Sequence, residues 1–537
     1  MKISGIFRAK PMTKDTTEQN MMADHSANNR RIAKNTLMLY ARMLVGMLVS
    51  LYTSRVLLNA LGVEDYGIYG AVGGFVSMFS LISSSLTASV SRFLTFELGT
   101  GNRERLKAVF GTSLLIQMAL AVIIVIVSET VGIWFLNNKM TIPAERMGAA
   151  GIVFQASIVS FVFGLLTVPF TSTIISHEKM GAFAWFGIFE IFARLGIVLL
   201  IAYCSAVKDR LIVYALLVVA LGVLMQALYV LYCRSRFEEC RFSLSFDRKI
   251  FREMGGFASW NFIGCTAGLL KDQGVNLLYN LFVGPVLNAA RGIAGSVNGA
   301  VSSFASNFMT ALNPQITKLY AAGDLKYVHS LVERGSKFSF YIILFFAVPI
   351  LLETEFVLGI WLGKYPEHSI DFVRLTLMLS LIGTLSNTLI NLQNATGKIR
   401  NYQIVVGGIL MLNFPLSYLC LKAGFNPEST YIVAILVDIA CLFARLLFLR
   451  KMAGLPVGRF IRTVLLNVTA VTVVAVILPF IIHLEMDYGW QRFVTVGFTS
   501  VVTVLLSILF VGCSNNERRF LIDKAKDFVK RLYVKAC

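Results

Sequence analysis

Residues 255–313 read GGFASWNFIGCTAGLLKDQGVNLLYNLFVGPVLNAARGIAGSVNGAVSSFASNFMTALN and contain two apolar runs, each long enough to cross a lipid bilayer. Lys271 and Asp272 lie near the middle of the first run, and Arg291 lies about two turns into the second. A charge at such a depth costs roughly 2.5 to 3.5 kcal/mol unless it is paired or faces water. These three side chains are therefore candidate functional residues.

The composition is that of a membrane protein. The chain has 537 residues, of which 56% are hydrophobic and 15% are charged, and its mean hydropathy is +0.71. Soluble domains carry roughly 25% charged residues, so a water-soluble globule is excluded. The net charge of +19 does not indicate nucleic acid, because Lys and Arg cluster in short segments between apolar runs, where topology and anionic lipid explain them.

The sequence indicates no metal site, disulfide framework or cofactor. Its eight cysteines lie in apolar runs or basic segments without paired spacing, so we expect free thiols and small core residues. The sequence has no GxxxxGK[ST] phosphate-binding loop, so direct ATP hydrolysis is not expected.

Apolar runs of similar length recur along the whole chain. A membrane-spanning helix needs about 20 mostly apolar residues, and by this criterion there are about fourteen candidates. They lie near residues 36–58, 68–91, 109–129, 148–172, 182–204, 211–232, 256–282, 286–312, 338–360, 372–394, 403–421, 430–449, 462–482 and 492–512. The sequence therefore predicts an all-α, polytopic membrane protein.

Basic residues in the connecting segments test this count. If both termini are cytoplasmic, about thirty-four Lys and Arg residues fall in inner segments and about seven in outer ones, as the positive-inside rule requires. One missed or invented span would destroy this alternation. The distribution thus supports about fourteen spans with both termini in the cytoplasm.

The chain also repeats itself at an offset of about 220 residues. Three landmarks recur in equivalent loops: 61–63 with 281–283, 101–102 with 323–324, and 176–180 with 395–399. The repeat predicts two pseudo-symmetric six-helix lobes in parallel orientation, followed by two further helices. The predicted segments are 1–35 (cytoplasmic), 36–232 (N-lobe), 233–254 (basic linker), 255–450 (C-lobe), 451–512 (last two spans) and 513–537 (cytoplasmic amphipathic tail).

Two related lobes facing each other across a central cavity are the architecture of an alternating-access transporter. The alternative is an old gene duplication that serves only packing.

The first hairpin resembles a known family. Residues 28–82 read NNRRIAKNTLMLYARMLVGMLVSLYTSRVLLNALGVEDYGIYGAVGGFVSMFSLI, with a Leu-Gly-Val-x-x-Tyr-Gly-x-Tyr element at 61–69. This stretch is similar to the start of bacterial polysaccharide exporters of the Wzx type. They belong to a superfamily that also includes lipid II flippases and multidrug-and-toxin extruders, and its pattern of spans and lobes covers nearly the whole chain.

The resemblance implies a flippase in the bacterial inner membrane. Its substrate would be an undecaprenyl-diphosphate-linked oligosaccharide, moved from the inner to the outer leaflet. Membrane lipids, a coupling ion (H+ or Na+) and polysaccharide-pathway proteins are the implied partners. In the family, an acid in the seventh span and an Arg in the eighth belong to the central cavity, and Asp272 and Arg291 occupy those spans.

The charges within the spans suit such a substrate, because cations outnumber acids and phosphate oxygens accept strong hydrogen bonds from Arg. The predicted substrate-binding residues are Arg42, Arg55, Lys271, Asp272 and Arg291. Other interpretations stay open: Arg55, like Arg92, could extend to lipid phosphates, and Lys271 or Asp272 could form an internal ion pair. Two further pairs are interpreted as structural: Glu190 with Arg194, and Asp438 with Arg445.

Two other functions compete with the flippase. A multidrug or cation antiporter on the same fold would place acids in the N-lobe cavity. A polysaccharide polymerase or glycosyltransferase would need a sizeable loop outside the membrane, and the longest predicted outer loop, near residues 130–147, has fewer than about twenty residues. The basic tail favours a helix lying on the inner leaflet, with docking of a pathway protein as the alternative.

Overall fold

The structure is a computed structural model that describes residues 14–138, 140, 142–204, 209–241, 246–282, 285–515 and 517–519. Every regular element within these ranges is helical, so the predicted all-α class is confirmed. Seven of the eight cysteines are described, and all seven are free thiols. The amphipathic helix predicted for the tail falls almost wholly outside the described residues.

The helices form two lobes and a C-terminal hairpin. The N-lobe consists of α1 (Lys14–Ser77), α2 (Ser80–Thr100), α3 (Arg103–Val127), α4 (Ile133–Asn138), α5 (Met147–Ser176), α6 (Met180–Tyr203) and α7 (Arg210–Arg236). The C-lobe consists of α8 (Arg248–Phe282), α9 (Pro285–Ala321), α10 (Leu325–Leu352), α11 (Thr354–Leu362), α12 (Ser369–Thr396), α13 (Arg400–Met411), α14 (Asn413–Lys422) and α15 (Ser429–Ala453). The hairpin consists of α16 (Val457–Phe460), α17 (Leu466–Glu485) and α18 (Trp490–Ser507).

Eleven helical segments of the described chain are long and apolar enough to cross a membrane. Three more have the length but are richer in glycine and polar residues: α8, α9 and residues 63–100, which are helical on both sides of a turn at 78–79. Together they give fourteen crossing segments, consistent with the prediction. The first segment passes into the second within α1, where Gly62 adopts a positive φ of 80° that turns the chain.

The three less apolar segments lie where the lobes meet, as does the first half of α1. Helix α2 contacts α8 and α9, and α1 contacts α9. A helix that faces another lobe or a water-filled space can carry polar residues that a helix surrounded by lipid cannot. Their composition therefore follows from their position.

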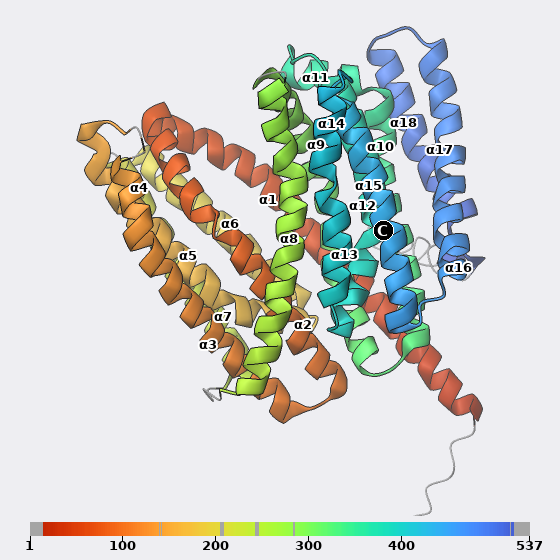
Figure 1. Ribbon diagram of the computed structural model, residues 1–537, viewed down its shortest axis with the longest axis horizontal. Helices are drawn as coiled ribbons and strands as arrows, with labels where there is room; N and C mark the ends of the chain where they lie inside the picture. Colours follow the sequence, from red (N-terminus) through yellow and green to blue (C-terminus); the bar gives the residue numbers. More distant parts are fainter. Residues whose placement is uncertain are drawn as a thin grey trace, which may run out of the picture.

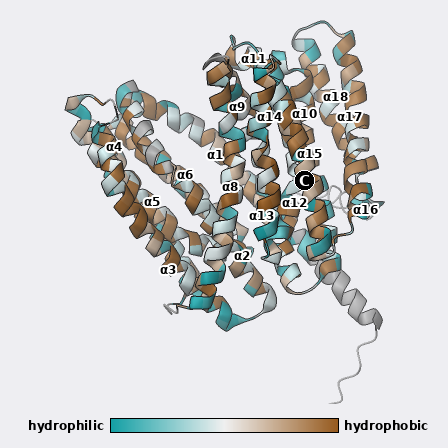
Figure 2. Cartoon of the chain, viewed as in Figure 1, coloured by the Kyte–Doolittle hydropathy of each residue, from teal (hydrophilic) through white to brown (hydrophobic). Residues whose placement is uncertain are grey.

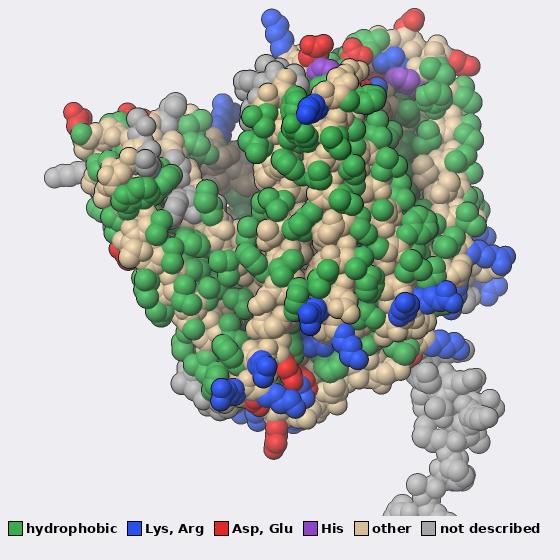
Figure 3. Space-filling model, viewed as in Figure 1, with side chains coloured by type: hydrophobic (Ala, Val, Ile, Leu, Met, Phe, Trp, Pro, Cys, Tyr) green, Lys and Arg blue, Asp and Glu red, His purple; other side chains and the backbone are tan. Residues whose placement is uncertain are grey.

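The lobes converge at one end of the molecule and separate at the other (Figure 1). Apolar residues dominate the middle of the helices (Figure 2), and Lys and Arg side chains gather at the end where the lobes converge (Figure 3). We call this the basic end, and the other the opposite end. Helices α2, α5, α9 and α12 finish at the basic end, so the loops that follow them lie there.

The hydrophobic cores of the two lobes are largely separate. The largest is built mainly from α8 to α18, with Ile32 of α1, and includes Tyr279, Phe372 and Phe460, all fully buried. The main N-lobe core also takes in Met254 and Phe257 from the start of α8. Apolar packing between the lobes is thus found at the start of α8 and along the first half of α1, where Ile32 joins the C-lobe core and Leu39 packs with Ala311 of α9.

Candidate functional site

The two lobes are joined at the basic end by hydrogen bonds from α2. Ser85 Oγ donates to the carbonyl of Ala258 at 2.6 Å, and Ser89 Oγ donates to that of Met254 at 3.0 Å. Further along α2, a Cβ atom on Gly99 would lie 2.5 Å from the carbonyl oxygen of Lys318. Only glycine permits this approach, so α2 and α9 are in backbone contact here.

Glu178, in the loop between α5 and α6, is the centre of a charged network at this end. Its carboxylate is 1% exposed and lies 2.7 Å from both Arg31 Nε and Lys318 Nζ. Gln315 Nε2 donates to the same carboxylate. Because Lys318 and Gln315 belong to α9, Glu178 binds the N-lobe to the C-lobe.

Arg92 makes a second connection between the lobes. Its Nε and Nη2 atoms donate to the carbonyls of Asn394 and Ala395, each at 3.2 Å, in the last turn of α12. Gly397 has a φ of 73°, and a Cβ there would lie 2.5 Å from Arg92 Nη2. The structure therefore replaces the predicted lipid contact of Arg92 with a cap on the negative end of a helix.

Between described residues, the side-chain hydrogen bonds and ion pairs that join the lobes all lie in the basic half. At the opposite end the surface is notched between the lobes (Figure 3). The structure is thus closed at the basic end and open at the other.

Lys271 is held inside the C-lobe by an acid from a distant helix. Its Nζ lies 2.6 Å from Asp438 Oδ1 on α15, and the two side chains are 10% and 14% exposed. Arg445 instead donates to Tyr402 Oη at 3.0 Å and to Ser386 Oγ at 2.9 Å. The predicted pairing of Asp438 with Arg445 is therefore wrong, because α8 brings an ammonium group closer to Asp438.

Asp272 and Arg291 lie close together, but not as an ion pair. Arg291 Nη2 donates to the backbone carbonyl of Asp272 at 2.9 Å, and its guanidinium lies within 6 Å of the Tyr279 and Tyr431 ring centroids. Within the described residues, neither the Asp272 carboxylate nor the Arg291 guanidinium has an oppositely charged partner within ion-pair distance. Both groups keep hydrogen-bonding capacity for a ligand.

The two N-lobe arginines lie apart from this group. Arg42 is half-buried, with its guanidinium 4.5 Å from the Phe183 ring centroid and packed against Gly187 of α6. Arg55 is exposed. Neither has a carboxylate partner among the described residues. Glu190 and Arg194, by contrast, lie 3.7 Å apart, as their spacing predicts.

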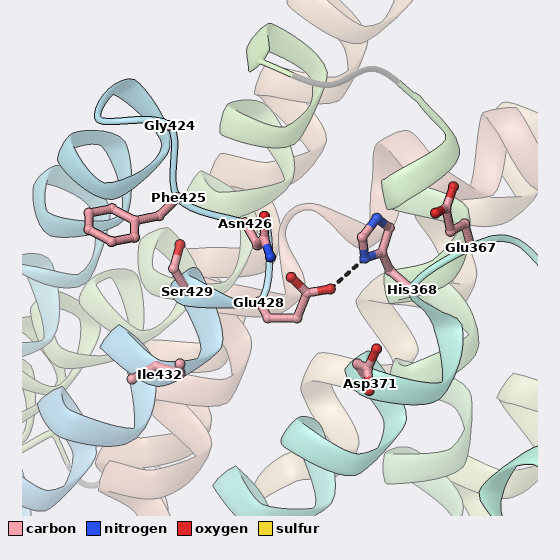
Figure 4. A pocket seen from close by; sticks show the side chains of 9 residues that line it. All are labelled: Glu367, His368, Asp371, Gly424, Phe425, Asn426, Glu428, Ser429 and Ile432. Atoms are coloured by element: carbon pink, nitrogen blue, oxygen red, sulfur yellow. Dashed lines mark hydrogen bonds and ion pairs between the residues drawn. The ribbon is translucent and has the colours of Figure 1, made fainter.

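A pocket of about 700 Å³ opens at the opposite end of the C-lobe (Figure 4). Its acids are Glu367, Asp371 and Glu428, and the Glu428 carboxylate contacts His368 Nδ1. In the part of the chain that the structure describes, no group of His, Cys, Asp and Glu is arranged to hold a metal ion. Sequence analysis missed this pocket because its walls come from two separate loops.

Comparison with solved structures identifies the architecture. A crystal structure of a MATE transporter in complex with MaD3S superposes with a TM-score of 0.66 at 12% identity, covering 81% of this chain and 97% of that one. The fold is that of the MATE transporters. The all-helical lobes, the crossing segments and this likeness describe a multi-pass membrane protein with the MATE transporter fold.

Two further MATE-fold structures are similar to this chain. The MATE transporter ClbM in complex with Rb+ matches at 15% identity, with a TM-score of 0.63, covering 77% of this chain and 94% of that one. A superfamily transporter from Pyrococcus furiosus, described as having a binding pocket of reversed polarity, matches at 12% identity with a TM-score of 0.64, over 79% and 96%. No family model and no curated protein matches the sequence.

Proposed function

We propose that this protein is a Wzx-type flippase that moves an undecaprenyl-diphosphate-linked oligosaccharide from the inner to the outer leaflet of the bacterial inner membrane by alternating access. The observation that carries the proposal is the balance of unpaired charge. Arg42, Arg55 and Arg291 have no carboxylate partner among the described residues, and the comparable acids are Asp272 and Glu129. A surplus of fixed cations in the spans favours an anionic substrate.

The structure corresponds to one state of such a cycle. We take the basic end as cytoplasmic by the positive-inside rule, so the closed end faces the cytoplasm and the open end faces the periplasm. Helices α1 and α9 contact each other through Tyr40 and Phe304 and through Met43 and Asn307, and they diverge toward the opposite end (Figure 1). The gap between them would let the lipid tail stay in the bilayer while the head group moves.

Arg291 is the residue best placed to bind the diphosphate, since its guanidinium is held by a backbone carbonyl and not by an acid. Asp272 fixes its position through that carbonyl, and Lys271 stabilises the C-lobe through Asp438. Arg42 and Arg55 would contact the head group from the N-lobe. The proposal includes no enzymatic step and no cofactor.

Deletion of the gene in its host tests the function. If the protein is a flippase, complete lipid-linked repeat units should accumulate on the cytoplasmic side of the membrane in the deletion strain. Single, unpolymerised units in the periplasm would indicate a polymerase instead and would contradict the proposal.

Arg291→Ala tests the site. Loss of a charge-assisted hydrogen bond worth about 1.5 to 3 kcal/mol should lower export at least about tenfold while the protein still inserts in the membrane. Arg194→Ala is the control, because that arginine lies in a span but is paired with Glu190. Unchanged export in Arg291→Ala would remove Arg291 from the mechanism.

A cation antiporter is the second candidate. The acids around the pocket of Figure 4 and the unpartnered Asp272 carboxylate favour a cationic ligand. Overexpression should then protect cells from organic cations, and Asp272→Asn should abolish the protection. If the protein is a flippase, its overexpression should not protect cells from organic cations.

A further inference from the structure

The bonds that close the basic end must break whenever that end opens. This inference rests on the proposed alternating access, in which the two lobes move as units. The bonds concerned are those of Arg92 with α12 and of Glu178 with α9. When each of these bonds breaks, a polar group loses its partner. The chemistry of the groups that are left shows which ligands the open end can bind.

On the N-lobe, Arg92 is the cation that loses its partners. The neighbouring acids stay neutralised within the lobe, since Glu97 lies 2.9 Å from Arg105 Nε and Glu178 lies 2.7 Å from Arg31 Nε. The Arg92 guanidinium lies 4.4 Å from the Phe93 ring centroid and 4.8 Å from that of Phe96. These rings would hold the guanidinium in place after α12 withdraws.

On the C-lobe, Lys318 loses Glu178. Gln315, one turn earlier on α9, loses the same carboxylate and becomes a neutral hydrogen-bond donor. Glu253 of α8 loses Arg105, from which it lies 3.1 Å in the closed state, but its side chain is already 36% exposed. Opening therefore uncovers a cation and an amide donor on α9, and a partly hydrated acid on α8.

We propose that Arg92 and Lys318 form an anion clamp, one cation on each lobe, that captures the diphosphate at the cytoplasmic mouth before it reaches Arg291. In the closed state, carbonyl and carboxylate oxygens occupy these donors. Phosphate oxygens are acceptors of the same kind and carry more charge than carbonyls, so they can take the vacated places. Closure of the lobes then returns each cation to its protein partner and passes the anion inward.

Binding of inorganic pyrophosphate to the purified full chain tests the clamp. Glu178→Gln weakens the closure but keeps both cations, so it should bind pyrophosphate more tightly than the wild type because the open state is more populated. Adding Arg92→Gln or Lys318→Met to Glu178→Gln should weaken binding at least about tenfold each. A purely structural role in closure would instead leave the affinity of the double variants equal to that of Glu178→Gln.

Arg103→Gln in the same background is the matched control. Arg103 lies at the same end and contacts Glu238 of its own lobe at 3.6 Å, with 81% of its side chain exposed. Its removal should leave the affinity for pyrophosphate unchanged. If Arg103→Gln weakened binding as much as Arg92→Gln or Lys318→Met, general surface charge would explain the binding, and the proposal would be overturned. Glu253→Gln should raise affinity modestly by removing the acid released on opening.

Competing lipids identify the ligand. Undecaprenyl diphosphate should displace pyrophosphate, whereas phosphatidylglycerol at the same concentration should not. Displacement by both would mean that the site binds lipid phosphate in general and would overturn selectivity for a diphosphate. Because these are binding measurements, a functional clamp in a protein that exports no oligosaccharide would refute the proposed function separately.

Discussion

Glu178 and Glu353 are buried carboxylates at opposite ends of the molecule. Each side chain is 1% exposed and binds two basic groups: Glu178 binds Arg31 and Lys318, each at 2.7 Å, and Glu353 binds His483 at 2.8 Å and Arg492 at 3.0 Å. The partners differ in where they belong. Lys318 is in the other lobe, whereas His483 and Arg492 are in the hairpin that packs on α10 of the same lobe.

This difference separates bonds that must break from bonds that can be permanent. The hairpin is also fixed at the basic end, where Arg459 lies 3.0 Å from Glu333 and Lys337 lies 3.3 Å from Glu517. Attached at both ends, it moves with the C-lobe as one body. Glu353 therefore contributes to stability in every state, and Glu178 contributes to the choice between states.

Replacing Glu353 with Ala should have the largest effect on stability. It leaves Arg492 without its buried counter-charge. Removing one partner of a buried ion pair lowers the free energy of unfolding by about 3 to 5 kcal/mol. Thermal unfolding in detergent should shift to clearly lower temperature without any change in the distance between the lobes. Glu355→Ala is the control, since that acid is exposed two residues away. If Glu353→Ala were as stable as Glu355→Ala, the inference that Glu353 fixes the hairpin to the C-lobe would be contradicted.

Replacing Glu178 with Gln should have a smaller effect on stability and a clear effect on conformation. The Arg31 side chain is half-exposed, so part of the lost ion-pair energy is recovered by water. A loss of about 1 to 3 kcal/mol from the closed state would change the ratio of states by about 5- to 150-fold. Spin labels at Asn102 and Ala322 should report a longer distance between the lobes, and Glu238→Gln should not change it.

The fold was predictable because bilayer thickness and loop charge constrain it strongly. The criterion of about 20 mostly apolar residues predicts even α8 and α9, although neither is among the eleven segments that are apolar enough by hydropathy, and the alternation of basic segments supports the total count. The residue boundaries of the lobes, and the assignment of the ends to cytoplasm and periplasm, stay predictions.

The partners of the charged residues were much less predictable. Spacing within one helix correctly paired Glu190 with Arg194, but the partner of Lys271 is Asp438, 167 residues away. The sequence carries no local signal for such a contact, because it depends on how α8 and α15 pack. Glu178 lies within one of the repeat landmarks, residues 176–180, yet its role depends on the approach of α9. The roles of Arg42, Arg55, Lys271, Asp272 and Arg291 in substrate binding stay predictions.

The smallest expected effect concerns a permanent bond at the opposite end of the N-lobe. Arg146 Nη1 lies 2.9 Å from Asp209 Oδ2, and Asp209 Oδ1 accepts hydrogen bonds from the amides of Leu211 and Ile212 at the start of α7. Burial alone would raise the pKa of Asp209, but the hydrogen bonds from Arg146 and from these amides outweigh it and hold the pKa below its ordinary value.

Since the folded-state pKa of Asp209 is lowered, its contribution to stability is present above the unfolded-state pKa and is lost as pH falls through the folded-state pKa. As pH falls from about 5 to below the unfolded-state pKa of about 3.9, the amides of Leu211 and Ile212 should lose protection from hydrogen exchange relative to the rest of α7, after correction for the intrinsic exchange rate. Asp209→Asn keeps an oxygen for these amides but has no charge to titrate, so its protection should not depend on pH. Equal pH dependence in both proteins would show that the first turn of α7 opens for a reason other than protonation of Asp209.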